Sequence, residues 1–220
     1  MNIWIVSILI LVILCILYFI WNLYTNNCHV LKRYNLPFGI VEIVDSNCQD
    51  GLPHTWSPSI IRMTESDWNS SRRDTILRHE RVHLRQRQDP IEWNRFYRSA
   101  WGYECTKLPP PGIPQHWLDR VRPNPDTADA LWAVWHGRYV FFPTYRDAKR
   151  SLRNASVQVW DIQKRQMVEP PAEWKQLFCD GGNCPVQYEH PHEISAEFIT
   201  QTVNNSPAAQ QLYNSLIIKQ

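Results

Sequence analysis

The stretch His79-Glu80-Arg81-Val82-His83 decides how the rest of this chain is interpreted. Two histidines four positions apart lie on the same face of an α-helix, so both imidazole rings can reach one metal ion. Glu80 follows the first histidine and points to a neighbouring face, from which its carboxylate can take a proton from a metal-activated water. The HExxH pattern therefore predicts a zinc site, with His79 and His83 as ligands and Glu80 as the general base.

The flanking sequence predicts a single helix from Asp74 to Gln88. Asp74 and Thr75 are favourable residues at a helix start, and no proline or glycine occurs before Pro90. Around a helical projection the arginines gather on one side and the two histidines nearly opposite them. The arginine side is typical of a solvated face, and the histidine side is expected to face inward. Without Glu80, two histidines hydrogen-bonded in a core or lying on a surface would be the simpler interpretation.

Zinc normally takes a third ligand from the protein and leaves a fourth position for water. A histidine six positions after His83 is excluded, because Asp89 stands there. Glu193 is the preferred candidate, since Pro191 suits the first turn of a helix and Ala196 would let that helix approach closely. Other candidates for the third ligand remain open: Glu92, Glu104, Glu189, His190, His192 and Glu197.

With these residues the chain resembles the gluzincin-type zinc metallopeptidases, which carry HExxH on one helix and a ligand glutamate on a later helix. It also resembles small zincin-like proteins of large DNA viruses and some bacteria. Those proteins share a segment like Gly51-Leu52-Pro53-His54-Thr55, a helix like that from Thr75 to Arg87, and a following proline, here Pro90. The resemblance implies a zincin-like fold and assigns His79, His83 and Glu193 as zinc ligands and Glu80 as the base.

The resemblance implies a zinc-dependent peptidase that hydrolyses peptide bonds with zinc-activated water, so that peptides or proteins are the expected partners. Together with the apolar N-terminus described below, it predicts a membrane-anchored peptidase. A second donor is needed for the developing oxyanion, and His54, Tyr139 and Tyr145 are candidates. The run around these tyrosines is more typical of a buried strand. Gln86, one turn after His83, can support that ligand or cap a polar cavity. Two alternatives remain: a catalytically silent zincin-fold structural or interaction protein of a membrane or virion, and a tethered binding domain with an accidental HExxH.

The N-terminus predicts a single transmembrane helix. Residues 3–20 are apolar except for Ser7, and about 20 such residues span a bilayer. A cleaved signal peptide is disfavoured, because a basic segment before the apolar run and a small-residue cleavage site after it are both missing. We therefore expect a transmembrane anchor at residues 1–25 and one zincin-like domain at residues 26–220. Lys32 and Arg33 favour the cytoplasm or a virion interior for that domain, whereas three Asn-x-Ser triplets leave its side open.

Composition and patterning predict one folded α+β domain. The net charge of +2, from 23 basic and 21 acidic residues, argues against a nucleic-acid partner. Cys179 and Cys184 can close a small disulfide loop or remain free thiols. We expect a small sheet against the HExxH helix, with these further elements: strands at 39–44, 59–63 and 157–160, a hairpin of 131–135 with 138–142, and helices starting at Pro90 and covering 191–203.

Overall fold

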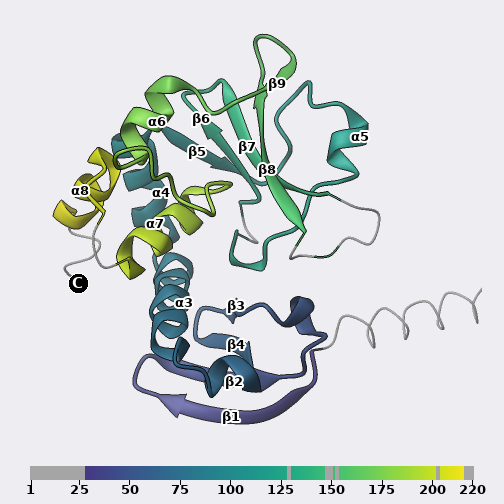
Figure 1. The fold of residues 1–220 in the computed structure, drawn as a ribbon, viewed down its shortest axis with the longest axis vertical. Helices are drawn as coiled ribbons and strands as arrows, with labels where there is room; N and C mark the ends of the chain where they lie inside the picture. The colour runs from purple at the N-terminus through teal and green to yellow at the C-terminus, as the bar shows by residue number, and fades with distance from the viewer. Residues whose placement is uncertain (1–27, 128–129, 147–150, 152–153, 202–203, 216–220) are drawn as a thin grey trace, which may run out of the picture.

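The structure is a computed structural model that describes residues 28–127, 130–146, 151, 154–201 and 204–215. These residues form an α+β architecture with two separate sheets joined by one long helix, α3 (Arg73–Gln88) (Figure 1). The sheet near the N-terminus is called the lower sheet here, and the sheet near the middle of the chain is called the upper sheet.

The lower sheet has four strands in the order β1-β2-β4-β3. They are β1 (Val30–Leu36), β2 (Gly39–Val44), β3 (His54–Ser57) and β4 (Ile60–Thr64), with a short 3-10 turn η1 (Cys48–Gly51) before β3 and helix α2 (Glu65–Trp68) after β4. β2 and β4 run parallel, while β1 and β3 are antiparallel edge strands. Helix α3 packs on this sheet through Leu77 and Leu84, which contact the buried aliphatic residues of β2 and β4. This contact fixes the HExxH helix on the sheet.

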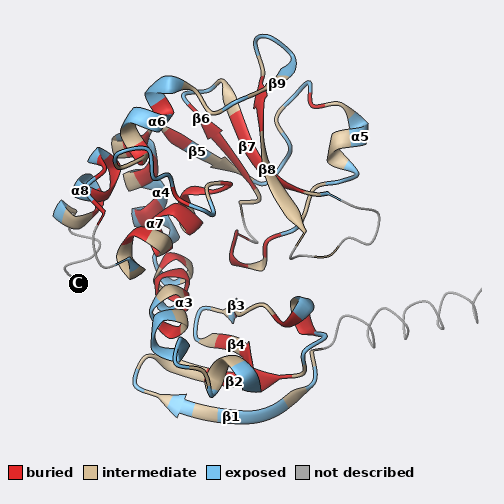
Figure 2. Cartoon of the chain, in the orientation of Figure 1, coloured by how far each residue is buried: buried red, intermediate tan, exposed pale blue. Residues whose placement is uncertain are grey.

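The upper sheet is an antiparallel meander in the order β5-β6-β7-β8-β9. Its strands are β5 (Tyr103–Thr106), β6 (Trp132–Trp135), β7 (Tyr139–Tyr145), β8 (Ala155–Asp161) and β9 (Gln166–Val168). Side chains alternate between the two faces of a strand. Phe141 accordingly joins the large core on one face, and Phe142 joins a smaller core on the other. Both faces of β7 are therefore buried, as the red colour of β6 and β7 in Figure 2 shows.

Helices cover the two faces of the upper sheet unequally. One face carries α4 (Pro90–Phe96), the π-helical turn η2 (Tyr97–Trp101), α6 (Ala172–Phe178), α7 (Pro191–Thr200) and α8 (Pro207–Asn214). The other face carries the short helix α5 (Gln115–Leu118). A short 3-10 turn, η3 (Pro125–Thr127), belongs to the segment that descends from the upper sheet towards β3 (Figure 1). Trp101 lies at the centre of the large core, where its ring contacts Tyr97, Phe178 and Phe198.

The expected transmembrane helix has to be corrected. Among the residues that the structure describes, no helix combines the length and the apolar character that crossing a membrane requires. Residues 1–25, where the span was expected, lie outside the described part of the chain. The prediction of a single-pass membrane protein is therefore not carried further, and the α+β architecture stands without it.

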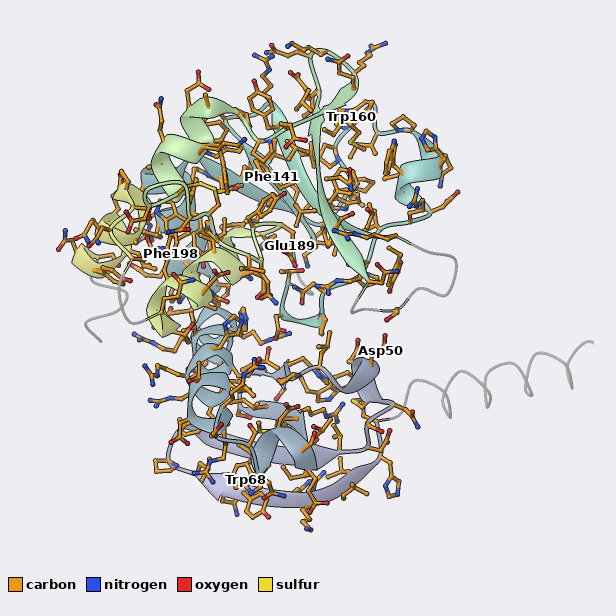
Figure 3. The ribbon with its side chains drawn as sticks, in the orientation of Figure 1. Asp50, Trp68, Phe141, Trp160, Glu189 and Phe198 are labelled. Carbon is orange, nitrogen blue, oxygen red and sulfur yellow. A yellow bond between two sulfur atoms is a disulfide. The ribbon has the colours of Figure 1, made fainter. Side chains whose placement is uncertain are left out.

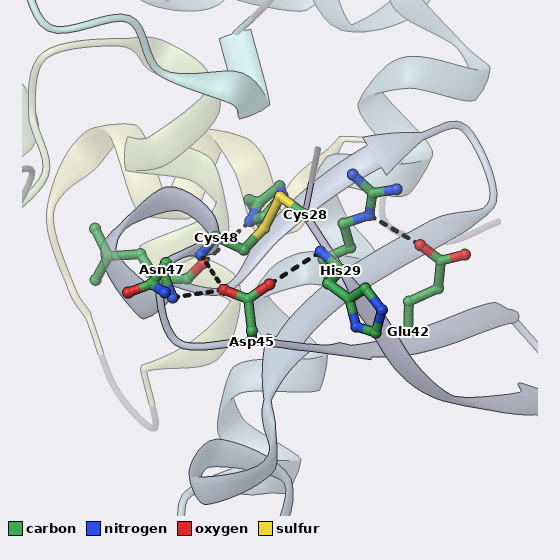
Figure 4. Close-up of a disulfide and its surroundings, with 9 residues drawn as sticks. Cys28, His29, Glu42, Asp45, Asn47 and Cys48 are labelled. Carbon is green, nitrogen blue, oxygen red and sulfur yellow. Dashed lines mark hydrogen bonds and ion pairs between the residues drawn. A yellow bond between two sulfur atoms is a disulfide. The ribbon is translucent and has the colours of Figure 1, made fainter. Parts of the chain in front are cut away.

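Two disulfides also correct the expected location. Cys28 is bonded to Cys48, which joins the start of β1 to η1 (Figure 4). Cys179 is bonded to Cys184. Asp45 supports the first bridge by accepting the main-chain N–H groups of His29 and Cys48. Disulfides form and persist in oxidising surroundings, whereas the cytoplasm keeps thiols reduced. The preference for the cytoplasm or a virion interior, which rested on two basic residues, is therefore wrong.

Candidate metal centre

The HExxH helix α3 meets helix α7 between the two sheets, and small residues of α7 permit this approach. Ser195 and Ala196 are fully buried at the contact, and Pro191 occupies the first turn of α7. His79 and His83 point from α3 towards this helix, and Glu193 points back from its first turn. The structure thus brings together the two histidines and the preferred third ligand, although 114 positions separate His79 from Glu193.

Three ligand atoms form a nearly equilateral triangle. The Nε2 atoms of His79 and His83 are 3.1 Å apart, and Oε2 of Glu193 lies 3.2 Å from the first and 3.4 Å from the second. In a tetrahedral zinc site with bonds of about 2.0 Å, two ligand atoms are about 3.3 Å apart. The donor set is also the pair of imidazoles and one carboxylate that zinc accepts. The residues present therefore fit a zinc ion.

Hydrogen bonds behind the triangle fix the histidine ring that is most deeply buried. Nδ1 of His83 donates to Oε1 of Gln86 at 2.7 Å, so whenever the ring is neutral its Nε2 presents a lone pair to the centre. The amide nitrogen of Gln86 donates to the hydroxyl of Ser195 at 2.9 Å and to that of Tyr97 at 3.1 Å. Gln86 therefore supports His83 from behind, which is one of the two roles expected for it from the sequence.

The carboxylate of Glu193 is held by a second residue. Nδ2 of Asn124 donates to Oε1 of Glu193 at 2.8 Å, so the other carboxylate oxygen remains directed at the two histidines. Both side chains are buried. Burial alone would raise the pKa of Glu193, but the neighbouring His83 and His79 hold that pKa well below its ordinary value. The carboxylate is consequently ionised and oriented for binding a cation.

Glu80 lies beside the triangle without belonging to it. Its side chain is 4% exposed and lines the cleft, and no described residue offers a hydrogen bond to its Oε2 atom. Burial, followed by the charge of Asp126, raises the pKa of Glu80 well above its ordinary value. A bound dication would lower this pKa again. A ligand atom of Glu80 also groups with one from His83 and one from Asp126, so carboxylate oxygens of Glu80, Asp126 and Glu193 all lie within 4.8 Å of a ring nitrogen of His83.

The charges around His83 favour a cation at this position. Burial alone would lower the pKa of His83, but the carboxylates of Glu193 and Asp126 raise it to about 10. The buried His190 has the opposite shift, because burial lowers its pKa to about 4. The carboxylates of Glu80, Asp126 and Glu193 are thus concentrated at the HExxH motif. A proton on His83 or a metal ion between the three ligands would neutralise them.

A cleft of about 280 Å³ opens in front of the triangle. One part of its wall is formed by the candidate ligands His79 and Glu193 together with Glu80. The rest of the wall comes from three other segments: Leu52, Pro53 and His54 before and in β3, Arg72 and Thr75 around the start of α3, and residues 122–126. A small substrate could therefore contact the candidate metal, Glu80 and two arginines, Arg72 and Arg122, at the same time. The second arginine is 13% exposed and pairs with Glu189, which lies where the chain passes beneath the upper sheet before α7 (Figure 3).

The other candidates for a third ligand lie elsewhere or have different roles. The carboxylate of Glu197 accepts the main-chain N–H groups of Val186 and Gln187, and Glu189 pairs with Arg122. On the surface Glu92 pairs with Arg95, and Glu104 with Arg98. His190 caps the start of α7, and Nδ1 of His192 donates to the carbonyl of Asp126. Among the described residues, only Glu193 of these candidates joins both histidines of the motif in one ligand group.

The three candidates for oxyanion donors occupy different places. His54 lines the cleft, where its Nδ1 donates to the carbonyl of Leu52 at 3.0 Å. Burial lowers the pKa of His54, so the neutral ring has no proton on Nε2 and could donate there only as an imidazolium. Tyr139 and Tyr145, at the two ends of β7, are not among the residues that line the cleft.

The segment Arg122-Pro123-Asn124-Pro125-Asp126-Thr127 was assigned no role in the site from the sequence. It supplies Asn124 to the ligand carboxylate and Asp126 to the surroundings of Glu80 and His83. A signal was present, because polar residues that alternate with prolines have their backbone largely fixed. The sequence offered no means of placing that segment beside α3 and α7.

Comparison with known proteins adds no family to this geometry. No family model, curated protein or solved structure matches the chain. The interpretation of the site therefore rests on the residues His79, Glu80, His83 and Glu193 and on the groups around them.

Proposed function

We propose that this chain is a zinc-dependent peptidase in which His79, His83 and Glu193 hold the metal and Glu80 is the general base. One observation carries the proposal: the triangle of ligand atoms, with sides of 3.1, 3.2 and 3.4 Å, next to a buried glutamate that lines the same cleft. A hydrogen-bonded histidine pair in a core would need neither the carboxylate at equal distance from both rings nor an opening to solvent.

The roles of the protein groups follow from their positions. Bound zinc would act as a Lewis acid towards a water molecule and the carbonyl oxygen of a peptide bond. Glu80 can accept the proton of the attacking water, because its side chain lines the cleft, no described residue donates a hydrogen bond to its Oε2, and a nearby cation favours its ionised form. It can then return the proton to the leaving amine. Gln86 and Asn124 keep His83 and Glu193 in orientation throughout.

The first test is the metal content of the full-length chain after zinc reconstitution, measured by plasma mass spectrometry beside His83→Ala. We expect about one zinc per chain, and its loss from the variant, because the ring of His83 is the most deeply buried of the ligands. A chain that holds well below one zinc would contradict the proposal, since no other described group combines two imidazoles with a carboxylate.

The second test separates a peptidase from a zinc-binding structural or interaction protein. Glu80→Gln preserves the size of the side chain but cannot accept a proton, so zinc content should remain and peptide hydrolysis should fall by about 100-fold or more. Hydrolysis that is unchanged in this variant would come from another site. If the zinc-loaded wild-type chain cleaves no peptide in a degenerate peptide mixture, the structural alternative replaces the peptidase.

A further inference from the structure

The edge strand nearest the cleft, β3, is covered on its outer side by residues 122–127, which we call the strap (Figure 1). An edge strand presents unpaired N–H and C=O groups, and proteins often hold an extended peptide there as an added strand. Leu52, Pro53 and His54 line the cleft and lead into β3. A peptide added to β3 would therefore run through the site, and the strap lies in its place.

The strap uses the main-chain groups that an added peptide would need. Oδ1 of Asp126 accepts the main-chain N–H of Thr55 at 2.7 Å and its hydroxyl at 2.6 Å. Arg87 donates to the carbonyl of Thr55 at 3.3 Å and also holds the carbonyl of Pro125. Successive residues of a strand direct their N–H groups to opposite edges. After Thr55, the next residue towards the cleft that faces the outer edge is Pro53, and proline has no N–H group. This part of β3 therefore has no free N–H for an incoming strand.

The strap is built into the site at several points. Asn124 donates to Glu193 at 2.8 Å and accepts the N–H of Asp126 at 3.0 Å, while the hydroxyl of Thr127 donates to the carbonyl of Asn124. The prolines at positions 123 and 125 restrict the backbone further. Asn124, Asp126 and Thr127 are all buried, and this part of the chain is red in Figure 2. These contacts make the strap a fixed wall of the cleft.

We propose that the strap restricts this site to short peptides and the ends of polypeptide chains, and excludes the middle of an extended chain. The inference rests on the proposed peptidase function and names its substrate class. With β3 closed, side chains must hold the substrate, and Arg72, Arg122 and Gln187 line the cleft for that purpose. The volume of about 280 Å³ is near the lower limit for small-molecule pockets and suits a few residues of peptide.

The test measures peptide binding to the zinc-loaded, full-length Glu80→Gln chain, which leaves the peptides uncut. Two probes are compared: a degenerate mixture of tripeptides with free ends, and a degenerate mixture of decapeptides with acetylated and amidated ends. Retention by ultrafiltration is read by mass spectrometry, and zinc content is measured on the same samples. We expect tripeptides to be retained at least about tenfold better, because the side chains that line the cleft can hold a short peptide, whereas the strap occupies the edge of β3 along which a decapeptide would have to extend.

Two variants at one position test the strap itself in the same background. Asp126→Ala removes the acceptor of both Thr55 hydrogen bonds, so decapeptide retention should rise by about tenfold. Asp126→Asn keeps an Oδ1 acceptor and should retain the selectivity for tripeptides. Hydrogen exchange of the Thr55 N–H provides a separate readout: it should be slow in the parent chain and in Asp126→Asn, and fast in Asp126→Ala.

The outcomes separate this inference from the proposed function. Decapeptides retained as well as tripeptides by the parent chain would overturn the role of the strap, and so would retention of neither probe at one zinc per chain. In both cases the zinc site would stand. A parent chain without zinc would overturn the proposed function, and the substrate class would fall with it.

Discussion

Replacing Glu193 by alanine should weaken zinc binding more than any other change of a single carboxylate in this chain. Its Oε2 atom lies 3.2 and 3.4 Å from the two histidine nitrogens, so the variant loses one of three proposed ligands. Even a residue that only hydrogen-bonds to a metal ligand contributes about 10- to 100-fold to metal affinity. Loss of the ligand itself should therefore raise the zinc Kd by at least about 100-fold, or about 2.7 kcal/mol.

The same substitution one turn later provides the matched control. Glu197 is on the same helix, but its carboxylate accepts the N–H groups of Val186 and Gln187 at 2.9 and 3.1 Å and lies away from the histidines. Glu197→Ala should therefore leave the zinc Kd within about threefold of the wild-type value. Both variants are made in the full-length chain, and the Kd is measured by competition with a chromophoric chelator.

The comparison has a clear refuting result. If Glu193→Ala binds zinc as tightly as the wild-type chain, this carboxylate is not a ligand and the triangle reflects hydrogen bonding alone. If Glu197→Ala shows the larger loss, the third ligand is the other glutamate and α7 is turned relative to α3. Circular dichroism of the zinc-free variants shows whether either substitution acts by unfolding the domain.

Three further outcomes are expected. Asn124→Ala should raise the zinc Kd by about tenfold, measured by the same chelator competition, because it removes the hydrogen bond that orients the ligand carboxylate. Asp161→Asn should lower the free energy of unfolding by about 1–2 kcal/mol at neutral pH, because the Arg138 hydrogen bond lowers the pKa of Asp161 from 3.8 to about 2. That difference in stability is present above pH 4 and disappears as the pH falls through 2, which thermal unfolding at several pH values will show. Replacing Cys28 and Cys48 by serine removes a disulfide between residues 20 positions apart, so the unfolded chain gains conformational freedom. The free energy of unfolding should therefore fall by about 3 kcal/mol, measured by denaturant titration.

Local patterns accounted for many of the elements. The strand expected at 39–44 has these bounds in the structure, and the expected hairpin about His136 and Gly137 joins β6 to β7. The helix expected at 191–203 begins at Pro191 and ends at Thr200. Such features depend on side-chain alternation and on the residues at helix ends, which are visible over a few positions. The edge strands β1, β3, β5 and β9 were missed, because their residues are partly exposed and show no clear alternation.

The sequence by itself determined the i, i+4 geometry of His79 and His83, the position of Glu80 between them, and the helical start before Glu193. Each follows from the fixed rise and rotation of a helix. Only the tertiary structure decided that α7 approaches α3, that Asn124 reaches Glu193 and that Asp126 closes β3. Those contacts join residues 114, 69 and 71 positions apart, and they depend on how the two sheets and their helices pack. Packing at such distances is set by the whole core, so no short stretch of sequence could specify it.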